Sequence, residues 1–450
     1  MTVSNFNLLQ HWYPVAPVED MPTDRPTPVT IAGIAIVLWQ PHHGDRKMEF
    51  CAAIDRCPHR LAPLSEGRLD DTSGNLMCSY HGWQFDDGGR CTRIPQAPNP
   101  EILDKTPDQF CLTSLPVRVA QDLIWVWPDA EHPDLAETTP LPLSPLLTQR
   151  DPAGADDPEI VCTSFMRDLP YDWQTLVENV SDPSHVPFAH HGLQGNRDTA
   201  GPNPLTIHQS TPTYIEARSS NGFLTSTISL EPPCRLEYTL KFASGKTLGL
   251  ITYSLPTEPG KSRLVAQFSR NFAQNVSGLT PRWWEHTKLR NTVLDSDMVL
   301  LYNQERSMRG YPANAWKSVY TMPTGSDRLV IEFRRWFDVH ADERLRSLTT
   351  DAPIAPEPLS RRELLDRYHQ HTEICSSCRT ALDRVQWGQR AALLVLALTL
   401  TVAATASEAI GVMGRGAAFA VAIAAIVAYG GLKYWLEPRF YFVDYRHPDH

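Results

Sequence analysis

The chain has 450 residues, a hydrophobic content of 42% and a formal net charge of −10. This length leaves room for two or three domains with sizeable cores, and the acidic balance argues against nucleic acid as a partner. The nine cysteines are odd in number and follow no regular spacing, which argues against a disulfide scaffold and for a reducing compartment.

Residues 1–130 are predicted to form a β-rich domain. Apolar runs with β-branched residues predict strands at residues 31–40, 48–55 and 123–127, separated by segments with Pro and Gly. The first residues lack the basic segment and long apolar core of a signal peptide, and they are not rich in Arg and Ser like a transit peptide. We therefore expect a bacterial chain or one that is already processed.

Two short motifs in this domain alternate cysteine with histidine. Cys57 and His59 form C-x-H, and after eighteen residues Cys78 and His81 form C-x-x-H. A Rieske [2Fe–2S] cluster needs two thiolates on one iron and two imidazoles on the other. The alternative is a Cys2His2 zinc site, but zinc sites usually pair Cys with Cys and His with His. The alternating order therefore favours the Rieske cluster, held on loops between strands.

The residues around these motifs distinguish two kinds of Rieske protein. Electron-transfer Rieske subunits carry an extra cysteine in each motif, joined as a disulfide, and here Ala62 and Tyr80 occupy those positions. Gly82 and Trp83 follow the second histidine, as in Rieske oxygenases. The sequence thus favours an oxygenase, which needs a second iron to activate oxygen.

We expect a linker at residues 131–157, which are rich in Pro, Asp and Thr, and a catalytic domain at residues 158–350. Residues 205–273 alternate as strands do, and a second strand group is predicted at residues 319–337. The predicted fold class is α+β, with an antiparallel sheet wrapped around long helices. Such a sheet would leave a cavity for a bulky substrate.

A second group of candidate metal ligands follows a predicted helix at residues 171–182. Asn179, Asp182 and His185 are each three residues apart, and His190 follows after two prolines. Two histidines with a carboxylate from elsewhere form the facial triad that binds non-haem Fe(II). An H-x4-H pair alone is a weak signal, but after a Rieske motif it predicts a mononuclear iron site.

The carboxylate is predicted on a helix at residues 282–306. Asp297 lies on the apolar stripe of this helix, where a carboxylate is costly unless it is paired or bound to a metal. Asp295 has polar helical neighbours and is expected to be solvated. We therefore choose Asp297 as the third iron ligand; the alternative is that it pairs with an arginine.

The C-terminal part contains two apolar runs, at residues 391–413 and 416–432, with a short Gly-rich link. Each approaches the ~20 residues that cross a bilayer, so we predict two transmembrane helices at residues 391–435. The alternative is a buried helical hairpin. Arginines and lysine flank the hairpin on both sides, which predicts that the helical linker at residues 351–390 and the tail at residues 436–450 face the cytoplasm.

The helical linker carries Cys375 and Cys378 as a C-x-x-C pair. Such a pair is either a thiol switch reduced by thioredoxin or an inert pair on a helix near the membrane. The residues alone favour neither.

The chain resembles the membrane-anchored Rieske oxygenases that include pheophorbide a oxygenase, the Rieske protein of the chloroplast envelope translocon and protochlorophyllide-dependent oxygenase. Because no plant-type leader precedes the matching part, we expect a prokaryotic member, such as a cyanobacterial one. The matching segments are residues 55–69, 78–96, 178–192, 259–272, 294–305, 327–337, 371–378 and 440–448.

The resemblance implies a role for each candidate residue. Asp182 would bridge a cluster histidine of one subunit to an iron histidine of its neighbour in a homotrimer, and Asn179 would lie near the iron. For Cys375 and Cys378 the resemblance favours the redox switch. The implied ligands are Cys57, His59, Cys78 and His81 for the cluster and His185, His190 and Asp297 for the iron.

The resemblance also implies monooxygenation with O2 on the thylakoid or plasma membrane, in contact with membrane lipid. The chain has no ferredoxin-type cysteine spacing or nucleotide-binding glycine loop, so electrons must come from ferredoxin, or from a reductase with ferredoxin. The expected substrate is a chlorophyll-pathway tetrapyrrole. The alternatives are a sterol or carotenoid-like substrate and, from another class, a membrane-bound redox carrier or sensor.

Overall fold

A computed structural model describes the chain at residues 6–43, 46–47, 49–99, 101–105, 107–147, 161–220, 222–273, 279–312, 314–349, 357–405 and 411–448. It divides into two compact units, which do not follow the predicted domain limits, so these limits stay predictions. The first unit comprises Met1–Gly278 and Val299–Glu357, and the second comprises Leu279–Met298 and Pro358–His450.

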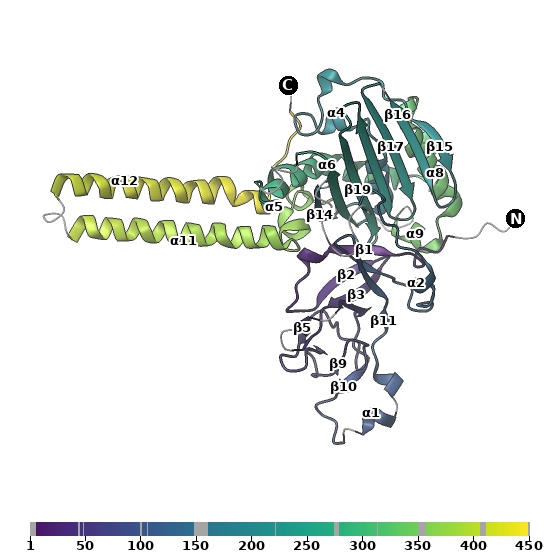
Figure 1. Ribbon diagram of the computed structural model, residues 1–450, viewed down its shortest axis with the longest axis horizontal. Helices are drawn as coiled ribbons and strands as arrows, with labels where there is room; N and C mark the ends of the chain where they lie inside the picture. Colours follow the sequence, from purple (N-terminus) through teal and green to yellow (C-terminus); the bar gives the residue numbers. More distant parts are fainter. Residues whose placement is uncertain are drawn as a thin grey trace. The chain divides into compact units, whose positions relative to one another are not determined.

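The described N-terminal part of the first unit contains three antiparallel sheets of three or four strands, drawn in purple and blue in Figure 1, and the two-stranded pair β4-β5. Their strand orders are β10-β9-β8-β7, β11-β6-β3-β2 and β1-β13-β12. The bounds are β1 (Tyr13–Pro17), β2 (Thr27–Ile31), β3 (Ile34–Trp39), β6 (Cys51–Ile54), β7 (Arg68–Leu69), β8 (Leu76–Met77), β9 (Gln84–Phe85), β10 (Cys91–Arg93), β11 (Ser114–Leu115), β12 (Val117–Ala120) and β13 (Leu123–Val126).

The strands predicted at residues 31–40, 48–55 and 123–127 are confirmed as β3, β6 and β13, although residue 48 lies outside the described residues. Ala32 and Gly33, both with positive φ, form the two-residue turn between β2 and β3. Buried apolar side chains, among them Trp39, Leu64 and Phe85, pack beneath the loops that follow β6 and β8. This packing holds both Cys-His motifs at the end of the sheets.

A seven-stranded antiparallel sheet forms the main layer of the first unit, in the order β14-β20-β19-β18-β17-β16-β15 (Figure 1). Trp173 anchors helix α3 to this sheet, since its indole N–H donates to the backbone oxygens of Pro233 and Ser254 at 3.0 Å each. The bounds are β14 (Val161–Leu169), β15 (Thr206–Ser210), β16 (Ile215–Ser220), β17 (Leu224–Glu231), β18 (Arg235–Phe242), β19 (Thr247–Pro256), β20 (Ser262–Arg270) and α3 (Trp173–Ser181).

The three-stranded sheet packs against the seven-stranded sheet through side-chain contacts. Trp125 on β13 meets Tyr253 on β19 edge to face, with ring centroids 5.2 Å apart, and Arg263 on β20 donates to the backbone oxygen of Val15 on β1. Trp125 and Tyr253 are buried, and Arg263 is half-buried. The predicted α+β class with a β-rich N-terminal domain and a sheet-and-helix domain is confirmed.

The strand group predicted at residues 319–337 is wrong. This segment forms α8 (Arg328–His340), which begins after a capping box at Thr324 and Asp327. The buried residues of α8 recur every three or four positions, as in a helix, and Phe333 and Phe337 pack against Trp173. The run of Leu, Val, Ile and Phe suggested a strand, but its burial follows the helical period.

Short elements complete the first unit. The predicted linker at residues 131–157 is described only to residue 147, and the rest lies outside the described residues. The elements are η1 (Val18–Asp20), β4 (His42–His43), β5 (Arg46–Lys47), α1 (Ile102–Lys105), η2 (Pro107–Phe110), α2 (Leu135–Thr138), α4 (Val186–Ala189), η3 (Arg197–Thr199), α7 (Trp316–Val319), η6 (Gly325–Asp327) and α9 (Glu343–Leu348).

The second unit is helical. Its helix α6 continues past Met298, so the last part of that helix belongs to the first unit. The elements are α5 (Arg282–Glu285), η5 (His286–Arg290), α6 (Asn291–Met308), α10 (Arg361–Leu364), η7 (Tyr368–Thr372), α11 (Ser376–Thr405), α12 (Gly411–Gly430), η8 (Gly431–Leu436) and α13 (Pro438–Tyr441).

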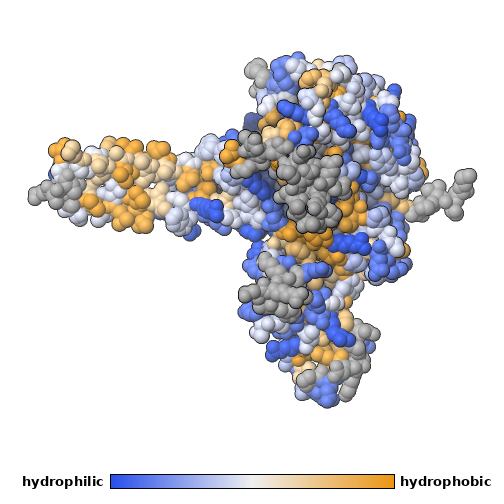
Figure 2. Space-filling view, viewed as in Figure 1, coloured by the Kyte–Doolittle hydropathy of each residue, from blue (hydrophilic) through white to orange (hydrophobic). Residues whose placement is uncertain are grey.

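Helices α11 and α12 form a hairpin of two long apolar helices, and Figure 2 shows hydrophobic side chains along it. In their most apolar stretches only 6% and 11% of the residues are buried. This disfavours the alternative of a buried hairpin and supports association with a membrane. The predicted Gly-rich link is misplaced, because Arg415 lies inside α12; residues 406–410, between the helices, lie outside the described residues.

Candidate metal centres

The two Cys-His motifs lie on loops with the same backbone form. Each loop is closed by two backbone hydrogen bonds in the same register, and its fifth residue has positive φ (Leu61 at 62° and Gly82 at 72°). The bonds join Cys57 N to Ala62 O (2.8 Å), Leu61 N to Cys57 O (2.9 Å), Cys78 N to Trp83 O (2.9 Å) and Gly82 N to Cys78 O (2.9 Å). The motifs are therefore presented by two matching turns.

The cysteines of these loops are buried, and the histidines lie towards solvent. Cys57 and Cys78 are each 2% exposed, His59 is exposed and His81 is half-buried. The two imidazole rings are 4.4 Å apart, and Trp83 stacks on His59 at 4.8 Å. Burial raises the pKa of the Cys57 thiol to about 12, so a bound cation is needed to hold its thiolate. Inner thiolates and outer imidazoles fit a two-iron cluster.

The predicted iron histidines come together at the two ends of helix α4. His185 precedes the helix and His190 follows it, and their Nε2 atoms are 3.2 Å apart. The Nδ1 of His185 donates to the backbone oxygen of Asp182 at 2.5 Å, which leaves the lone pair of its Nε2 directed towards His190. This is the tautomer that a metal-binding histidine needs.

Asp182 ends helix α3 and is half-buried, as is Asn179 one turn earlier. One carboxylate oxygen of Asp182 accepts from the backbone N–H of Ser184 at 2.7 Å, and the other lies 3.9 Å from Nδ1 of His185. Asp182 thus orients His185 mainly through its backbone carbonyl.

Asp297 lies on α6 and is 3% exposed. Because α6 is one unbroken helix, Asp297 is held two residues before the part of the helix that belongs to the first unit. The candidate ligand atoms of His185, His190 and Asp297 lie within 4.8 Å of one another. Two imidazoles and a carboxylate at this spacing fit the donor set of a non-haem iron site. The roles of these residues as ligands stay predictions.

The expectation that Asp295 is solvated is wrong. This carboxylate is 1% exposed and forms a buried ion pair with Arg367 at 2.6 Å. Arg367 also donates to the backbone oxygen of Thr287 at 3.0 Å. The partner of Asp295 comes from a segment that the helical pattern of residues 282–306 could not show.

Family comparisons identify the kind of protein to which these centres belong. The Rieske [2Fe–2S] domain model matches residues 11–116, and the pheophorbide a oxygenase model matches residues 230–314. The chain is 38% identical to the chloroplastic pheophorbide a oxygenase of Oryza sativa subsp. japonica, over 98% of this chain and 84% of that protein. The chain belongs to the pheophorbide a oxygenase family.

Another relative in the same family has a name that states a different activity. The chain is 34% identical to the chloroplastic flavonoid 8-hydroxylase 2 of Ocimum basilicum, over 98% of this chain and 86% of that protein. Among solved structures, dicamba monooxygenase bound to dicamba matches with a TM-score of 0.59 and 21% identity, over 75% of this chain and 98% of that chain. This likeness confirms the oxygenase fold.

As a member of the pheophorbide a oxygenase family, the protein is a Rieske non-haem iron oxygenase. Its cofactors are a Rieske [2Fe–2S] cluster and a mononuclear non-haem iron. Such an enzyme uses O2, a small-molecule substrate and an electron donor. The redox-carrier alternative is therefore not retained.

The protein also contains a buried cluster of carboxyl and guanidinium groups that the sequence did not predict. Three carboxyl groups and two guanidinium groups surround the start of α3, and Arg334 pairs there with Glu178. Burial raises the pKa of Glu178 to about 7 and that of Glu305 to about 8. The members of this carboxyl cluster are Asp172, Glu178, Glu305, Arg309 and Arg334.

Cys375 and Cys378 lie at the start of α11, both buried and without a disulfide bond. Sequence reasoning missed their two neighbours, His286 and His371. His371 could have been found, because it lies only four residues before Cys375 in the same short segment. The sequence carries no comparable signal for His286.

Proposed function

We propose that the protein is a monooxygenase that inserts one atom of O2 into a tetrapyrrole of the chlorophyll pathway, by hydroxylation or ring opening. The observation that carries this proposal is the 38% identity to the pheophorbide a oxygenase of Oryza sativa over 98% of the chain. The relative named flavonoid 8-hydroxylase 2 favours one second candidate, hydroxylation of a planar phenolic substrate. The sterol and carotenoid alternatives have no such support.

In this proposal the two centres have separate tasks. The cluster would supply electrons one at a time, and the iron would supply the place where O2 meets the substrate, with one oxygen atom entering the product and the other leaving as water. The side chains that hold them would be Cys57, His59, Cys78 and His81 for the cluster, and His185, His190 and Asp297 for the iron.

Asp182 is proposed to link the two centres across a homotrimer, between His81 of one subunit and His185 of the next. Its carbonyl already holds Nδ1 of His185, and its carboxylate is 29% exposed and can accept a further hydrogen bond. Asn179, one turn away, would lie beside the iron. The role proposed for Asp182 is to orient His185 and to shorten the route of the electron.

The proposed electron donor is ferredoxin, alone or with its reductase. The exposed His59 marks the end of the cluster site that a donor can approach, and Arg60 next to it lies over the ring of Tyr80 at 5.6 Å. An acidic donor would meet this positive surface. The arginines proposed to form it, all exposed, are Arg56, Arg60, Arg68 and Arg90.

The α11–α12 hairpin is proposed to anchor the enzyme in a thylakoid or plasma membrane, with the catalytic part on the cytoplasmic side. Arg379, Arg384 and Arg390 at the start of α11 support this orientation. A membrane anchor suits a large apolar substrate that partitions into lipid.

Cys375 and Cys378 have two candidate roles, a dithiol switch reduced by thioredoxin and a pair of metal ligands. A switch requires thiols that an oxidant or a partner can reach. Here the two side chains are 1% and 0% exposed, which favours the metal ligands.

The proposal is tested by turnover of the full chain in lipid nanodiscs with reduced ferredoxin and isotopically labelled O2. The substrates offered are pheophorbide a, chlorophyllide a, protochlorophyllide and a flavone. Label in a tetrapyrrole product supports the proposal. Label only in the flavone product, or in no product while the iron content is about three atoms per chain, rejects it.

A further inference from the structure

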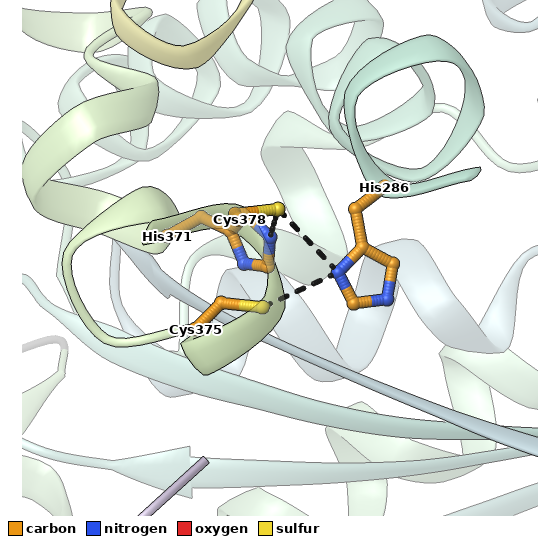
Figure 3. Close-up of side chains that lie close together, drawn as sticks. All are labelled: His286, His371, Cys375 and Cys378. Carbon is orange, nitrogen blue, oxygen red and sulfur yellow. Dashed lines mark hydrogen bonds between the residues drawn. The ribbon is translucent and has the colours of Figure 1, made fainter. Parts of the chain in front are cut away.

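A second group of two cysteines and two histidines lies in the helical unit (Figure 3). His286 begins η5, His371 lies in η7, and Cys375 and Cys378 lie at the start of α11. Each of the four residues is at most 2% exposed. Three separate segments thus place two sulfur and two nitrogen donors around one buried point, and neither iron centre uses any of them.

The distances between the donor atoms match those around a single ion. Nδ1 of His286 lies 3.6 Å from Sγ of Cys375 and 3.9 Å from Sγ of Cys378, and Nε2 of His371 lies 3.3 Å from Sγ of Cys378. All four ligand atoms lie within 4.8 Å of one another. With zinc–sulfur bonds of about 2.3 Å and zinc–nitrogen bonds of about 2.0 Å, a tetrahedral site separates sulfur from nitrogen by about 3.5 Å.

We propose that His286, His371, Cys375 and Cys378 form a structural zinc site, distinct from both iron centres. Tetrahedral S2N2 donor sets favour zinc, and a closed site without an open position is typical of structural rather than catalytic zinc. A two-iron cluster is disfavoured, because it would hold the sulfurs and the nitrogens at opposite ends rather than interleaved around one point.

The proposed site would fix two segments of the helical unit to each other. His286 lies at the start of the continuous helical run that carries Asp297 eleven residues later, and Cys375 and Cys378 lie at the base of the membrane hairpin. Zinc would therefore join the helix of a proposed iron ligand to the start of α11. A structural ion of this kind contributes directly to folding stability.

The test is the metal content of the full chain, purified with a tag that contains no histidine and analysed by mass spectrometry. We expect about one zinc per chain in addition to the iron. His371→Ala and Cys378→Ser should lose the zinc and keep the iron. The matched controls should keep both metals; they are His369→Ala, an exposed histidine two residues from His371, and Cys162→Ser on β14.

A second measurement needs no variant. Cobalt exchanged into the wild-type chain should give the thiolate charge-transfer bands and the intense visible bands of tetrahedral Co(II). Zinc absent from the wild type, zinc retained in both variants, iron in place of zinc at this site, or a Cys375–Cys378 disulfide found by alkylation of the native protein would each overturn the proposal. The disulfide would instead support the thiol switch.

Discussion

The chain contains two sets of two cysteines and two histidines, which differ in how far the histidines reach solvent. In the Rieske loops His59 is exposed and His81 is half-buried, above cysteines that are 2% exposed. In the helical unit His286 and His371 are 2% and 0% exposed, so they are buried as deeply as the two cysteines.

This difference separates two uses of the same four ligands. A centre that passes electrons must bring one edge close to a partner, and exposed imidazoles on matching turns provide that edge. A centre that only holds segments together is best closed on all sides, as helices provide in the second set. The ligand types alone do not distinguish the two uses, but their order and burial do.

Replacing one cysteine of each set gives the largest expected effects. Cys78→Ser should abolish the Rieske signal in the electron paramagnetic resonance spectrum of the reduced protein, because the cluster loses a thiolate. Cys378→Ser should keep that signal in full. Cys91→Ser, a buried cysteine in the same core as Cys78, is the matched control and should also keep it. Loss of the signal in Cys378→Ser would contradict the separation of the two sites.

A buried ion pair close to the second set tests whether that region depends on charges as well as on metal. Arg367→Met removes the guanidinium group that pairs with the buried carboxylate of Asp295, which is expected to destabilise the helical unit by about 3–5 kcal/mol. Hydrogen exchange in peptides from α6 and η7 would show the loss as faster exchange.

The control for this change is Arg362→Met, an exposed arginine over the ring of Phe442. It should alter exchange little, since surface pairs contribute about 0–1 kcal/mol. Equal effects of the two substitutions would show that the Arg367–Asp295 pair contributes no more to stability than an exposed arginine does.

A substitution at Asp182 tests whether the Rieske cluster passes electrons to the iron through this residue, a link for which the buried set in the helical unit has no counterpart. Asp182→Asn should lower turnover about 10–100-fold, because it removes the carboxylate proposed to accept a hydrogen bond from His81 of the neighbouring subunit, while the backbone carbonyl that holds His185 is unchanged and both iron sites stay filled. Reoxidation of the reduced cluster by O2 in the presence of substrate should slow to the same extent. Asp198→Asn, an exposed carboxylate in η3, should change neither rate. Slower turnover with an unchanged rate of cluster reoxidation would rule out the connecting role.

The sequence predicts the features whose signals are local. The Rieske motifs lie within one short segment, so their spacing indicated them, and the His185–His190 pair gained its meaning from following a Rieske motif. The partner of Asp295 lies 72 residues away, and His286 lies 89 residues from Cys375, so no periodicity could reveal either contact. In α8 the β-branched residues suggested a strand, because pairing partners are not visible in a single sequence.

The carboxyl cluster around Asp172 provides a third way to stabilise buried charge, by a retained proton rather than a metal. Its three carboxyl groups face two guanidinium groups, so one negative charge would remain uncompensated if all were ionised. Burial raises the pKa of Glu305 to about 8, from 4.5 for the ordinary group, so the folded protein binds a proton that the unfolded chain releases between these values.

Stability should therefore fall as the pH rises from 4.5 to 8. We expect the Tm of the wild type to be a few degrees lower at pH 8.5 than at pH 6, and Glu305→Gln to reduce this difference, because glutamine is neutral at both values. Glu258→Gln, at an exposed site, should leave the difference unchanged. A pH dependence that is the same in the wild type and Glu305→Gln would show that the retained proton is not on this cluster.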